Sequence, residues 1–396
     1  MKSVRDLNLY GKKVLVRVDY NLPMDENLNI TDDNRILSSL PLIEYLIEKE
    51  AKIVLISHMG RPSGKKEPEF SLAPAADRLS SFLSRDVAFV DDCIGCDVEN
   101  AVKKLHNGEI LLLENLRFHK EEKANDPGFS KELASFCDVY VNDAFSVSHR
   151  CHASIVGIPE FAAESAAGFL LEKELASYHA AIDNPERPLV AIVGGVKVSS
   201  KLGALKNMLK YVDKLIIGGA MANTFLKSRG IDVGASRVEE DLIETAAGII
   251  KEAEQKGIDF YLPVDLVVAE KFDKNALKKE VSIENIPASW MGLDIGSETG
   301  KLFADAIKGA GTIVWNGPMG VFEMERFRSG TQAVADAVAE SNGFSVIGGG
   351  DTDLAVKLCN AADKMDYIST GGGAFLCLME GKQLPGVAAL EKKENL

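Results

Sequence analysis

Short apolar runs that end in glycine and lead into a helical pattern recur in the second half of this chain. The runs span residues 189–193, 215–217, 344–347 and 367–369, and the glycines that follow them are Gly194-Gly195, Gly218-Gly219, Gly348-Gly349-Gly350 and Gly371-Gly372-Gly373. A buried strand that breaks into a tight turn before a helix has this pattern. Its repetition predicts parallel strands whose carboxyl ends share one edge, with the glycine turns lining a single cleft.

The turn after residue 347 has the composition of an anion site. Its glycines let the backbone approach a phosphate closely, and the first N–H groups of the following helix point at that phosphate. Asp351 and Thr352 carry oxygens that are able to reach a metal bound to it. An ordinary glycine turn with Asp or Thr as the helix N-cap explains this one segment equally well. The repetition of the pattern favours the anion site.

Further apolar runs alternate with amphipathic helical stretches from one end of the chain to the other. The remaining candidate strands span residues 13–18, 53–57, 110–113, 139–142, 264–268 and 313–315. Such runs, with helices between them, indicate parallel sheets covered on both faces. The strand ends carry Asp, His and Arg before about residue 165 and mostly Gly after about residue 185. We therefore expect an α/β fold with two doubly wound, Rossmann-like parallel-sheet domains.

The stretch between the two halves has a pattern of its own. Residues 164–182 carry an apolar helical stripe, and Pro185 and Pro188 follow it as a stop signal. We expect domains at 1–165 and 185–383, joined by a hinge helix at 166–184 that lets them move as rigid bodies. A core helix of a single domain is the alternative.

Polar and basic residues gather at the strand ends of the first half. They are Asp19, Asn21, Arg35, His58, Arg61, Arg117 and Arg150. Each Arg or His alone is more ordinary as a solvated or salt-bridged surface residue. On parallel strands, however, these ends converge, so the guanidinium groups form forks suited to a phosphate or carboxylate. Asp19 and Asn21 are then left to hold a hydroxyl group.

Composition narrows the classes of function. The chain of 396 residues has 45 Lys and Arg against 59 Asp and Glu, and its formal net charge of -14 argues against a nucleic-acid-binding surface. No uncharged apolar run approaches the roughly 18 residues that span a bilayer, and the N-terminus has no apolar signal core. We therefore expect a cytoplasmic protein that does not bind membranes.

The cysteines offer one further motif. All six are scattered, which favours a reducing compartment over a disulfide scaffold. Cys93 and Cys96 have the spacing of a thiol pair, but a structural zinc site usually needs a second ligand pair. Cys151-His152 is not a convincing one, so small buried or surface thiols are the default interpretation.

Basic side chains in one half and backbone amides in the other imply transfer between two bound ligands. The economical reaction is phosphoryl transfer, which needs positioning and charge neutralisation more than covalent chemistry. The chain lacks Gly-x-Gly-x-x-Gly and the P-loop spacing, and His149-Arg150-Cys151 lacks the Asp that a protein kinase uses as base. A nucleophile that is already ionised, such as a carboxylate, is then expected, and its product is an acyl phosphate.

Two other classes of protein stay open at this point. An NAD-dependent dehydrogenase fits the parallel sheets but lacks the glycine fingerprint and its acidic ribose partner. A non-catalytic two-domain protein that binds anions or nucleotides fits the hinge. It leaves unexplained why glycine turns and basic forks lie on opposite halves.

Over its whole length the chain resembles the phosphoglycerate kinase family. The motifs that carry the resemblance are Arg17-Val-Asp-Tyr-Asn21, Ser57-His-Met-Gly-Arg-Pro62, Glu114-Asn-Leu-Arg-Phe118, Gly194-Gly-Val-Lys197, Trp315-Asn-Gly-Pro-Met-Gly320, Gly348-Gly-Gly-Asp-Thr352 and Ser369-Thr-Gly-Gly-Gly373. The resemblance implies reversible phosphoryl transfer between ATP and 3-phosphoglycerate, giving ADP and 1,3-bisphosphoglycerate, with Mg²⁺ as cofactor, in glycolysis and gluconeogenesis. It also implies a monomer and a C-terminal tail, about 384–396, that returns to the first domain. Two anion sites, with no activated Ser or His beside a base, predict direct in-line transfer, and substrates spread across an open cleft predict domain closure.

The resemblance assigns roles residue by residue. The triose substrate is expected to meet Asp19, Asn21, Arg35, His58, Arg61, Arg117 and Arg150. The nucleotide is expected to meet Gly194, Lys197, Lys201, Gly218, Gly292, Asn316, Pro318, Glu323, Gly349, Gly350, Asp351 and Thr352, with Glu323 at the ribose and Asp351 at the magnesium. The transferring group is expected to meet Arg35, Lys197 and the amides of Gly371, Gly372 and Gly373.

The chain departs from the family pattern in two places. Ser146-Val-Ser148 stands where Gly-Thr-Ala is usual, and this change could shift the backbone that presents Arg150. Phe375 and Cys377 replace a small residue and Glu after the last glycine triplet, which alters the helix beside the expected cleft.

Overall fold

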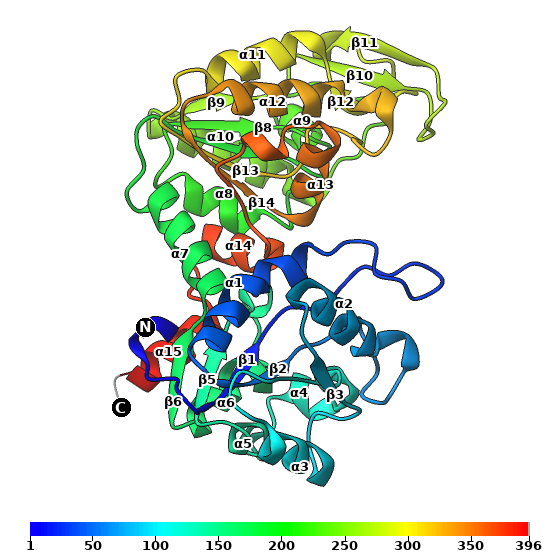
Figure 1. Cartoon of the computed structure of the whole chain (residues 1–396). Helices are drawn as coiled ribbons and strands as arrows, with labels where there is room; N and C mark the ends of the chain where they lie inside the picture. The colour runs from blue at the N-terminus through cyan, green and yellow to red at the C-terminus, as the bar shows by residue number, and fades with distance from the viewer. Residues whose placement is uncertain (395–396) are drawn as a thin grey trace. The chain divides into compact units, whose positions relative to one another are not determined.

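The computed structural model describes residues 1–394 of the chain. They form two compact units, both drawn in Figure 1. The first unit comprises Met1–Leu175 and the C-terminal segment that starts at Gln383, and the second comprises Ala176–Lys382. Each unit contains a six-stranded sheet. The expected α/β class with two parallel sheets is confirmed.

The first unit is built on a parallel sheet with strand order β3-β4-β2-β1-β5-β6. Its strands are β1 (Lys13–Arg17), β2 (Lys52–Ile56), β3 (Val87–Val90), β4 (Ile110–Leu113), β5 (Val139–Asn142) and β6 (Glu164–Ala167). Its helices are α1 (Asn34–Glu48), α2 (Ala73–Leu83), α3 (Cys96–Lys104), α4 (Lys120–Ala124), α5 (Pro127–Ser135), α6 (Ile158–Phe161) and α15 (Pro385–Glu394). Because α15 contacts β6 and α6, the C-terminal segment packs on this unit (Figure 1).

Strand β1 shows why this sheet forms. Val14 and Val16 belong to one core cluster with Leu42 and Leu79, which lie on α1 and α2. Leu15, between the two valines, points to the opposite face and is also fully buried. A strand that is covered on both faces has a continuous apolar sequence, and this explains the runs seen in the chain.

The second unit has a parallel sheet with strand order β15-β14-β13-β7-β8-β9. Its strands are β7 (Leu189–Val193), β8 (Lys214–Ile217), β9 (Asp259–Tyr261), β13 (Thr312–Asn316), β14 (Phe344–Gly348) and β15 (Tyr367–Ile368). Its helices are α8 (Leu202–Met208), α9 (Ala222–Ser228), α10 (Ile243–Gln255), α11 (Ser297–Ile307), α12 (Ser329–Glu340), α13 (Gly350–Leu358) and α14 (Gly372–Met379). The glycine turns therefore follow β7, β8, β14 and β15, as the sequence predicted.

A smaller antiparallel sheet in this unit was not expected. It has the order β11-β10-β12 and consists of β10 (Asp265–Ala269), β11 (Lys278–Ser282) and β12 (Met291–Ile295). The run at 264–268 is thus wrongly predicted as a strand of a parallel sheet. Strand β10 is buried along its whole length, like the parallel strands, whereas its partner β11 is mostly exposed and has no apolar run.

The stretch at 164–182 is not helical from its start. Residues Glu164–Ala167 form β6, which pairs with β5, and α7 (Phe169–Ile182) begins only afterwards. Helix α7 contains residues of both units. Asp143, which follows β5, accepts hydrogen bonds from the backbone N–H groups of Leu170 (2.7 Å) and Leu171 (3.4 Å). These bonds satisfy free donors in the first turn of the helix and place its start.

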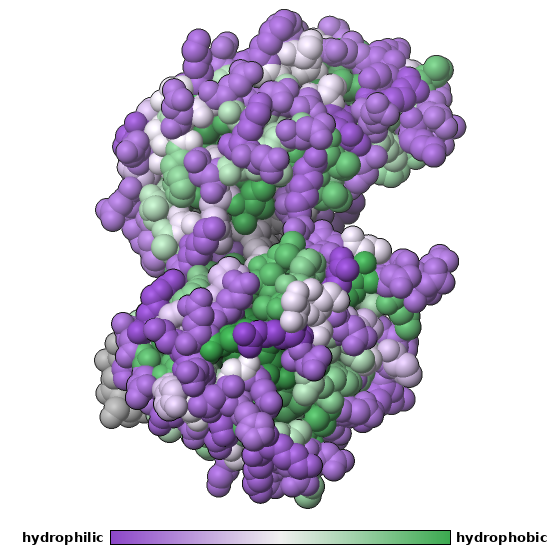
Figure 2. All heavy atoms as spheres, in the orientation of Figure 1, coloured by the Kyte–Doolittle hydropathy of each residue, from purple (hydrophilic) through white to green (hydrophobic). Residues whose placement is uncertain are grey.

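The surface agrees with the charged composition of the chain. Most atoms on the face drawn in Figure 2 belong to hydrophilic residues, and hydrophobic residues appear there in scattered patches. Across residues 1–394, none of the helices combines the length and the apolar character needed to cross a membrane.

Candidate functional site

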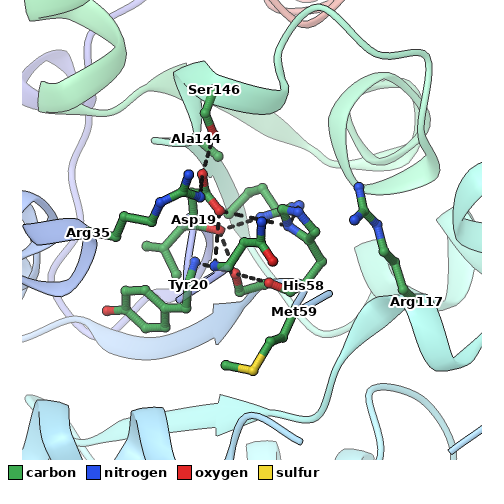
Figure 3. Close-up of polar contacts among 12 residues, drawn as sticks. Asp19, Tyr20, Arg35, His58, Met59, Arg117, Ala144 and Ser146 are labelled. Atoms are coloured by element: carbon green, nitrogen blue, oxygen red, sulfur yellow. Dashed lines mark hydrogen bonds and ion pairs between the residues drawn. The ribbon is translucent and has the colours of Figure 1, made fainter. Parts of the chain in front are cut away.

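The first unit gathers a charged cluster where β1, β2 and β5 end. Asp19 follows β1, and its carboxylate accepts hydrogen bonds from Arg35 of α1 and from the hydroxyl of Ser146 (Figure 3). Burial raises the pKa of Asp19, but Arg35, with His58, Ser146 and Arg17, lowers it to about 2. Asp19 is therefore ionised at neutral pH and acts only as a hydrogen-bond acceptor.

His58 is held in one protonation state by Arg17. The Nη2 atom of the fully buried Arg17 lies 3.0 Å from Nδ1 of His58, and Arg17 Nε donates to Ser154 (2.9 Å). Burial, together with Arg17, places the pKa of His58 well below its usual value. A guanidinium group only donates, so Nδ1 of this neutral imidazole accepts and Nε2 carries the proton.

Asn21 and Arg117 meet at the backbone of Gly60. The N–H of Gly60 donates to Oδ1 of Asn21 (2.7 Å), and Nη1 of Arg117 donates to the Gly60 carbonyl (2.6 Å). Burial, together with the positive charges of Arg17 and Arg150, lowers the pKa of Arg117 to about 10. Neighbouring cations that lower one another's pKa are typical of a site that binds an anion.

Of the residues expected to bind the triose, five form a connected cluster and two lie more openly. Asp19 pairs with Arg35, lies 3.9 Å from Nδ1 of the neutral His58, and accepts the Asn21 N–H at 3.1 Å. Asn21 in turn is joined to Arg117 through Gly60. Arg150 is exposed and acts on Arg117 and His149 through its charge. Arg61 is exposed and directly follows Gly60 in the chain.

Sequence reasoning missed two members of this cluster. Arg17 is fully buried at the end of β1, although a charged residue in an otherwise apolar strand is itself a signal. Ser146, noted only as a departure from the family pattern, donates its hydroxyl to Asp19. Ser146 is therefore part of the charged cluster.

The second unit contains a pocket of about 580 Å³ beside its glycine turns, within the size range of small-ligand sites. Residues expected at a nucleotide that line it are Gly292, Pro318, Glu323 and Asp351. The turns contribute Gly195 and Gly219 rather than the preceding Gly194 and Gly218. A Cβ on Gly194 or Gly218 would run into Pro318 or Met319. These two glycines therefore allow close packing behind the pocket wall.

Lys201 is a partly buried cation that lies next to Gly195 of the pocket wall, although it is not itself among the lining residues. Its Nζ donates to the backbone carbonyl (2.8 Å) and to the side-chain oxygen of Asn316. Burial lowers its pKa to about 8, and the nearby carboxylate of Asp351 opposes that shift. Among residues 1–394 no carboxylate lies within ion-pair distance of this ammonium group. A buried cation that is not neutralised by an ion pair attracts an anionic ligand.

Hydrogen bonds from the side chains of Asn316 and Thr352 connect the turns that follow β13 and β14. The side-chain amide of Asn316 donates to the Gly348 carbonyl (2.8 Å). The hydroxyl of Thr352 donates to the same carbonyl (2.8 Å) and accepts from the N–H of Gly317 (2.7 Å). Since this hydroxyl is buried and fully engaged, Thr352 shapes the turn, which differs from the expectation that its oxygen reaches a metal.

The last glycine turn packs against the turn before α13. A Cβ on Gly372 would lie 3.0 Å from Cα of Gly349, and Gly349 itself has a φ of +99° that side chains disfavour. Helices α13 and α14 begin at Gly350 and Gly372, so their free N–H groups start at adjoining turns. Lys197 lies in the exposed loop after β7. Burial raises the pKa of Glu239, but hydrogen bonds from Ser199 and Val198 lower it, and the charge of Lys197 adds to that lowering.

We expect Gly194→Ala to destabilise the second unit by about 1–3 kcal/mol, because a Cβ would meet the Gly317 carbonyl oxygen at 2.6 Å and force the backbone apart. Urea unfolding measures the change. Gly248→Ala on α10 is the matched control, since open space surrounds that position and alanine favours a helix by up to about 1 kcal/mol. Equal stability of the Gly194 variant and the parent would contradict the close packing described here.

The whole chain is similar to known proteins of one family. A family model described as phosphoglycerate kinase matches residues 4–382. The phosphoglycerate kinase of Desulforapulum autotrophicum is 64% identical over 391 residues, covering 99% of this chain and 100% of that protein, and the one of Desulfosudis oleivorans is 55% identical over 394 residues, covering 100% of both. The solved phosphoglycerate kinase structure from Coxiella burnetii superposes with a TM-score of 0.91 at 42% identity, covering 99% of each chain. The chain belongs to the phosphoglycerate kinase family.

Proposed function

We propose that this phosphotransferase passes the phosphoryl group directly, in line, between a nucleotide bound to the second unit and 3-phosphoglycerate bound to the first. The observation that carries the proposal is the partly buried Lys201 ammonium group, which lies beside the glycine turns and Asp351 without an ion-pair partner in residues 1–394. Such a group is suited to the charge of nucleotide phosphates. Phosphoryl transfer needs this positioning and charge neutralisation more than covalent catalysis.

The triose is proposed to bind at the charged cluster of the first unit. Arg61, Arg117 and Arg150 supply guanidinium groups for its phosphate. Ionised Asp19 accepts a hydrogen bond from a hydroxyl group, and the proton on Nε2 of neutral His58 is available to a substrate oxygen. The domain assignment follows: a triose-binding domain at 1–165 with the tail from about 384, and a nucleotide-binding domain at 185–383.

The nucleotide is proposed to occupy the 580 Å³ pocket. Glu323 lines it and provides a carboxylate for the ribose hydroxyl groups, while Lys201 meets the phosphates. Arg35, Lys197 and the amides of Gly371 and Gly372 are proposed to stabilise the charge on the oxygens of the transferring group.

Asp351 fits the role of magnesium ligand. It is an exposed carboxylate in the first turn of α13, it lines the pocket, and its charge acts on Lys201. Carboxylate oxygen is the ligand type that Mg²⁺ prefers, and this ion usually binds through one or two carboxylates together with substrate phosphates. When bound with the nucleotide, Mg²⁺ neutralises charge on the phosphate oxygens.

Direct transfer is tested with ATP labelled in its γ-phosphate. With ATP alone, the intact-protein mass is expected to stay unchanged, and adding 3-phosphoglycerate is expected to yield 1,3-bisphosphoglycerate in a coupled assay. A phosphorylated enzyme that forms with ATP and passes its label to 3-phosphoglycerate would overturn direct transfer while leaving the enzyme class intact.

Domain closure about a hinge at 166–184 is part of the same proposal, because water must be excluded before the phosphoryl group moves. Small-angle scattering is expected to show a smaller radius of gyration with both substrates present than with either alone. We further expect a cytoplasmic monomer, and light scattering on the same sample checks the mass. A radius that does not respond to the substrate pair would remove the hinge from the mechanism.

A further inference from the structure

Three ligand-type side chains, none of them assigned to the substrates, converge in the first unit. Asp92 and Cys93 follow β3, and His119 precedes α4. One ligand atom of each, a carboxylate oxygen, the thiol sulfur and an imidazole nitrogen, lies within 4.8 Å of the other two. Cys93 belongs to the thiol pair noted in the sequence, and the fold brings it a histidine from a distant segment rather than a second thiol pair.

The spacing of these atoms is close to that of a metal site. His119 Nε2 lies 2.7 Å from Asp92 Oδ1, and the sulfur lies within 4.8 Å of both. In a tetrahedral zinc site, bonds of 2.0–2.3 Å place neighbouring ligand atoms about 3.3–3.8 Å apart. Each pair therefore needs to move by about an ångström or less, which small side-chain rotations supply.

The surroundings favour a cation. Cys93 is 1% exposed, and burial raises the pKa of its thiol well above the usual value, with the carboxylates of Asp92, Glu122 and Glu114 adding to the shift. The same negative field attracts a divalent cation, which stabilises the thiolate. Burial raises the Asp92 pKa, but hydrogen bonds from His119 and from the Cys93 N–H outweigh it, so this carboxylate is ionised and ready to bind.

Two of the three ligand side chains are accessible to solvent, and neighbouring groups hold them in place. The side chains of Asp92 and His119 are 37% and 24% exposed, so an ion reaches them from solvent. The imidazole of His119 packs against Phe129 with ring centroids 5.4 Å apart, and Asp92 Oδ1 accepts the Cys93 N–H at 2.7 Å. Lys66 Nζ lies 4.0 Å from Asp92 Oδ2, but it donates to the Asp91 backbone carbonyl and pairs with the Asp91 carboxylate at 3.2 Å. Asp91 therefore holds this ammonium group, and Asp92 Oδ1 stays available to an ion.

We propose that Asp92, Cys93 and His119 bind one Zn²⁺ ion, with water as the fourth ligand. Sulfur, imidazole nitrogen and carboxylate oxygen together suit zinc, whereas Mg²⁺ prefers oxygen ligands alone. Binding releases the thiol proton to solvent, and the proton that His119 Nε2 donates to Asp92 shifts to Nδ1, so that Nε2 is free to bind the ion. The step involves no redox change. The ion links the end of β3 to the segment that carries Arg117, two residues before His119, so it stabilises the first unit. The alternative is a plain Asp92–His119 ion pair beside an inert thiol.

Co²⁺ serves as the spectroscopic probe. The full-length chain, with the exposed Cys96 and Cys151 replaced by serine and stripped by a chelator, is titrated with Co²⁺. We expect a thiolate-to-cobalt charge-transfer band that saturates at one ion per chain and is displaced by Zn²⁺. Cys93→Ser is expected to abolish the band, and His119→Gln to weaken binding at least about tenfold, the lower end of losses seen for residues that only support a ligand.

Two outcomes would overturn the proposal: no band at saturating Co²⁺, or a band of equal intensity in Cys93→Ser. Circular dichroism and the kinase assay check that the Cys93 variant is folded. If it does not fold, X-ray absorption of the zinc-loaded parent decides the matter, since a coordination shell without one sulfur contradicts the site. Zn²⁺ is also expected to raise the thermal midpoint of the parent but not of a folded Cys93 variant.

Discussion

Arg35→Ala is expected to lower the turnover number by a factor on the order of 100 to 1000, the usual loss when a preorganised donor is removed from a transition state. Arg35 is held by the carboxylate of Asp19, with its side chain 34% exposed, so it is both positioned and accessible. Its removal also leaves the buried Asp19 with less compensating positive charge. Steady-state kinetics with ATP and 3-phosphoglycerate measure the effect.

Two control variants separate chemistry from folding. Arg35→Lys keeps the charge but loses the planar fork, so it is expected to recover only part of the lost turnover. Arg78→Ala removes another arginine of the same unit that pairs with a carboxylate, Asp33, at the surface. Such pairs contribute about 0–1 kcal/mol to stability, and turnover is expected to stay normal. Near-normal turnover in Arg35→Ala would remove this residue from the transferring group.

Lys201→Met is expected to reduce kcat/KM for the magnesium nucleotide about 100-fold or more, because a buried positive charge near the phosphates is lost while the length of the side chain is kept. The pH dependence tests the same residue independently. Burial lowers the Lys201 pKa to about 8, so the ammonium form, which attracts phosphate, is lost as pH rises through that value. Nucleotide affinity of the parent is expected to fall about tenfold between pH 7 and pH 9.

The fall in nucleotide affinity between pH 7 and pH 9 is expected to disappear in Lys201→Met, because methionine does not titrate. Isothermal titration with ADP across the pH range measures both proteins. Lys206→Met on α8 is the matched control, because Lys206 is exposed whereas Lys201 Nζ is held by Asn316 beside the glycine turns. A parent whose affinity stays constant up to pH 9, or a Lys201→Met protein with the same alkaline loss, would show that another group binds the phosphates.

The sequence predicted those strands that are buried on both faces. Strands β1 and β7 are continuous apolar runs, and their ends follow from the polar residues and glycines that come next. It missed β3, β6, β9, β11 and β12, most of which are short or partly exposed. A short edge strand of Ser and Ala such as β6, or a mostly exposed strand rich in Lys such as β11, carries no such run. Their pairing depends on neighbours distant in sequence, as in the bridge between Ser3 and Ala167 beside β6.

The residues of the candidate site were likewise predicted only in part. Strand ends and family motifs were enough to select Asp19, Arg35 and Arg117, because the carboxyl ends of parallel strands converge. They did not disclose that Arg17 determines the tautomer of His58, since this depends on a contact across neighbouring strands. Nor did they separate glycines that line the pocket from those that pack behind it, which requires the positions of Pro318 and Met319.

The two halves of the proposed enzyme differ in how they respond to acidity. Around the triose cluster, Asp19 titrates near 2, Arg117 near 10, and His58 well below its usual range, so the charge carried by these three residues is constant across neutral pH. Between about pH 5 and 7, triose binding is then expected to follow the ionisation of the substrate's own phosphate, whose second pKa is about 6, rather than that of any of these three residues. Mild acidity would thus act on the proposed enzyme through protonation of its substrate, while alkalinity would act through Lys201, whose pKa burial lowers to about 8.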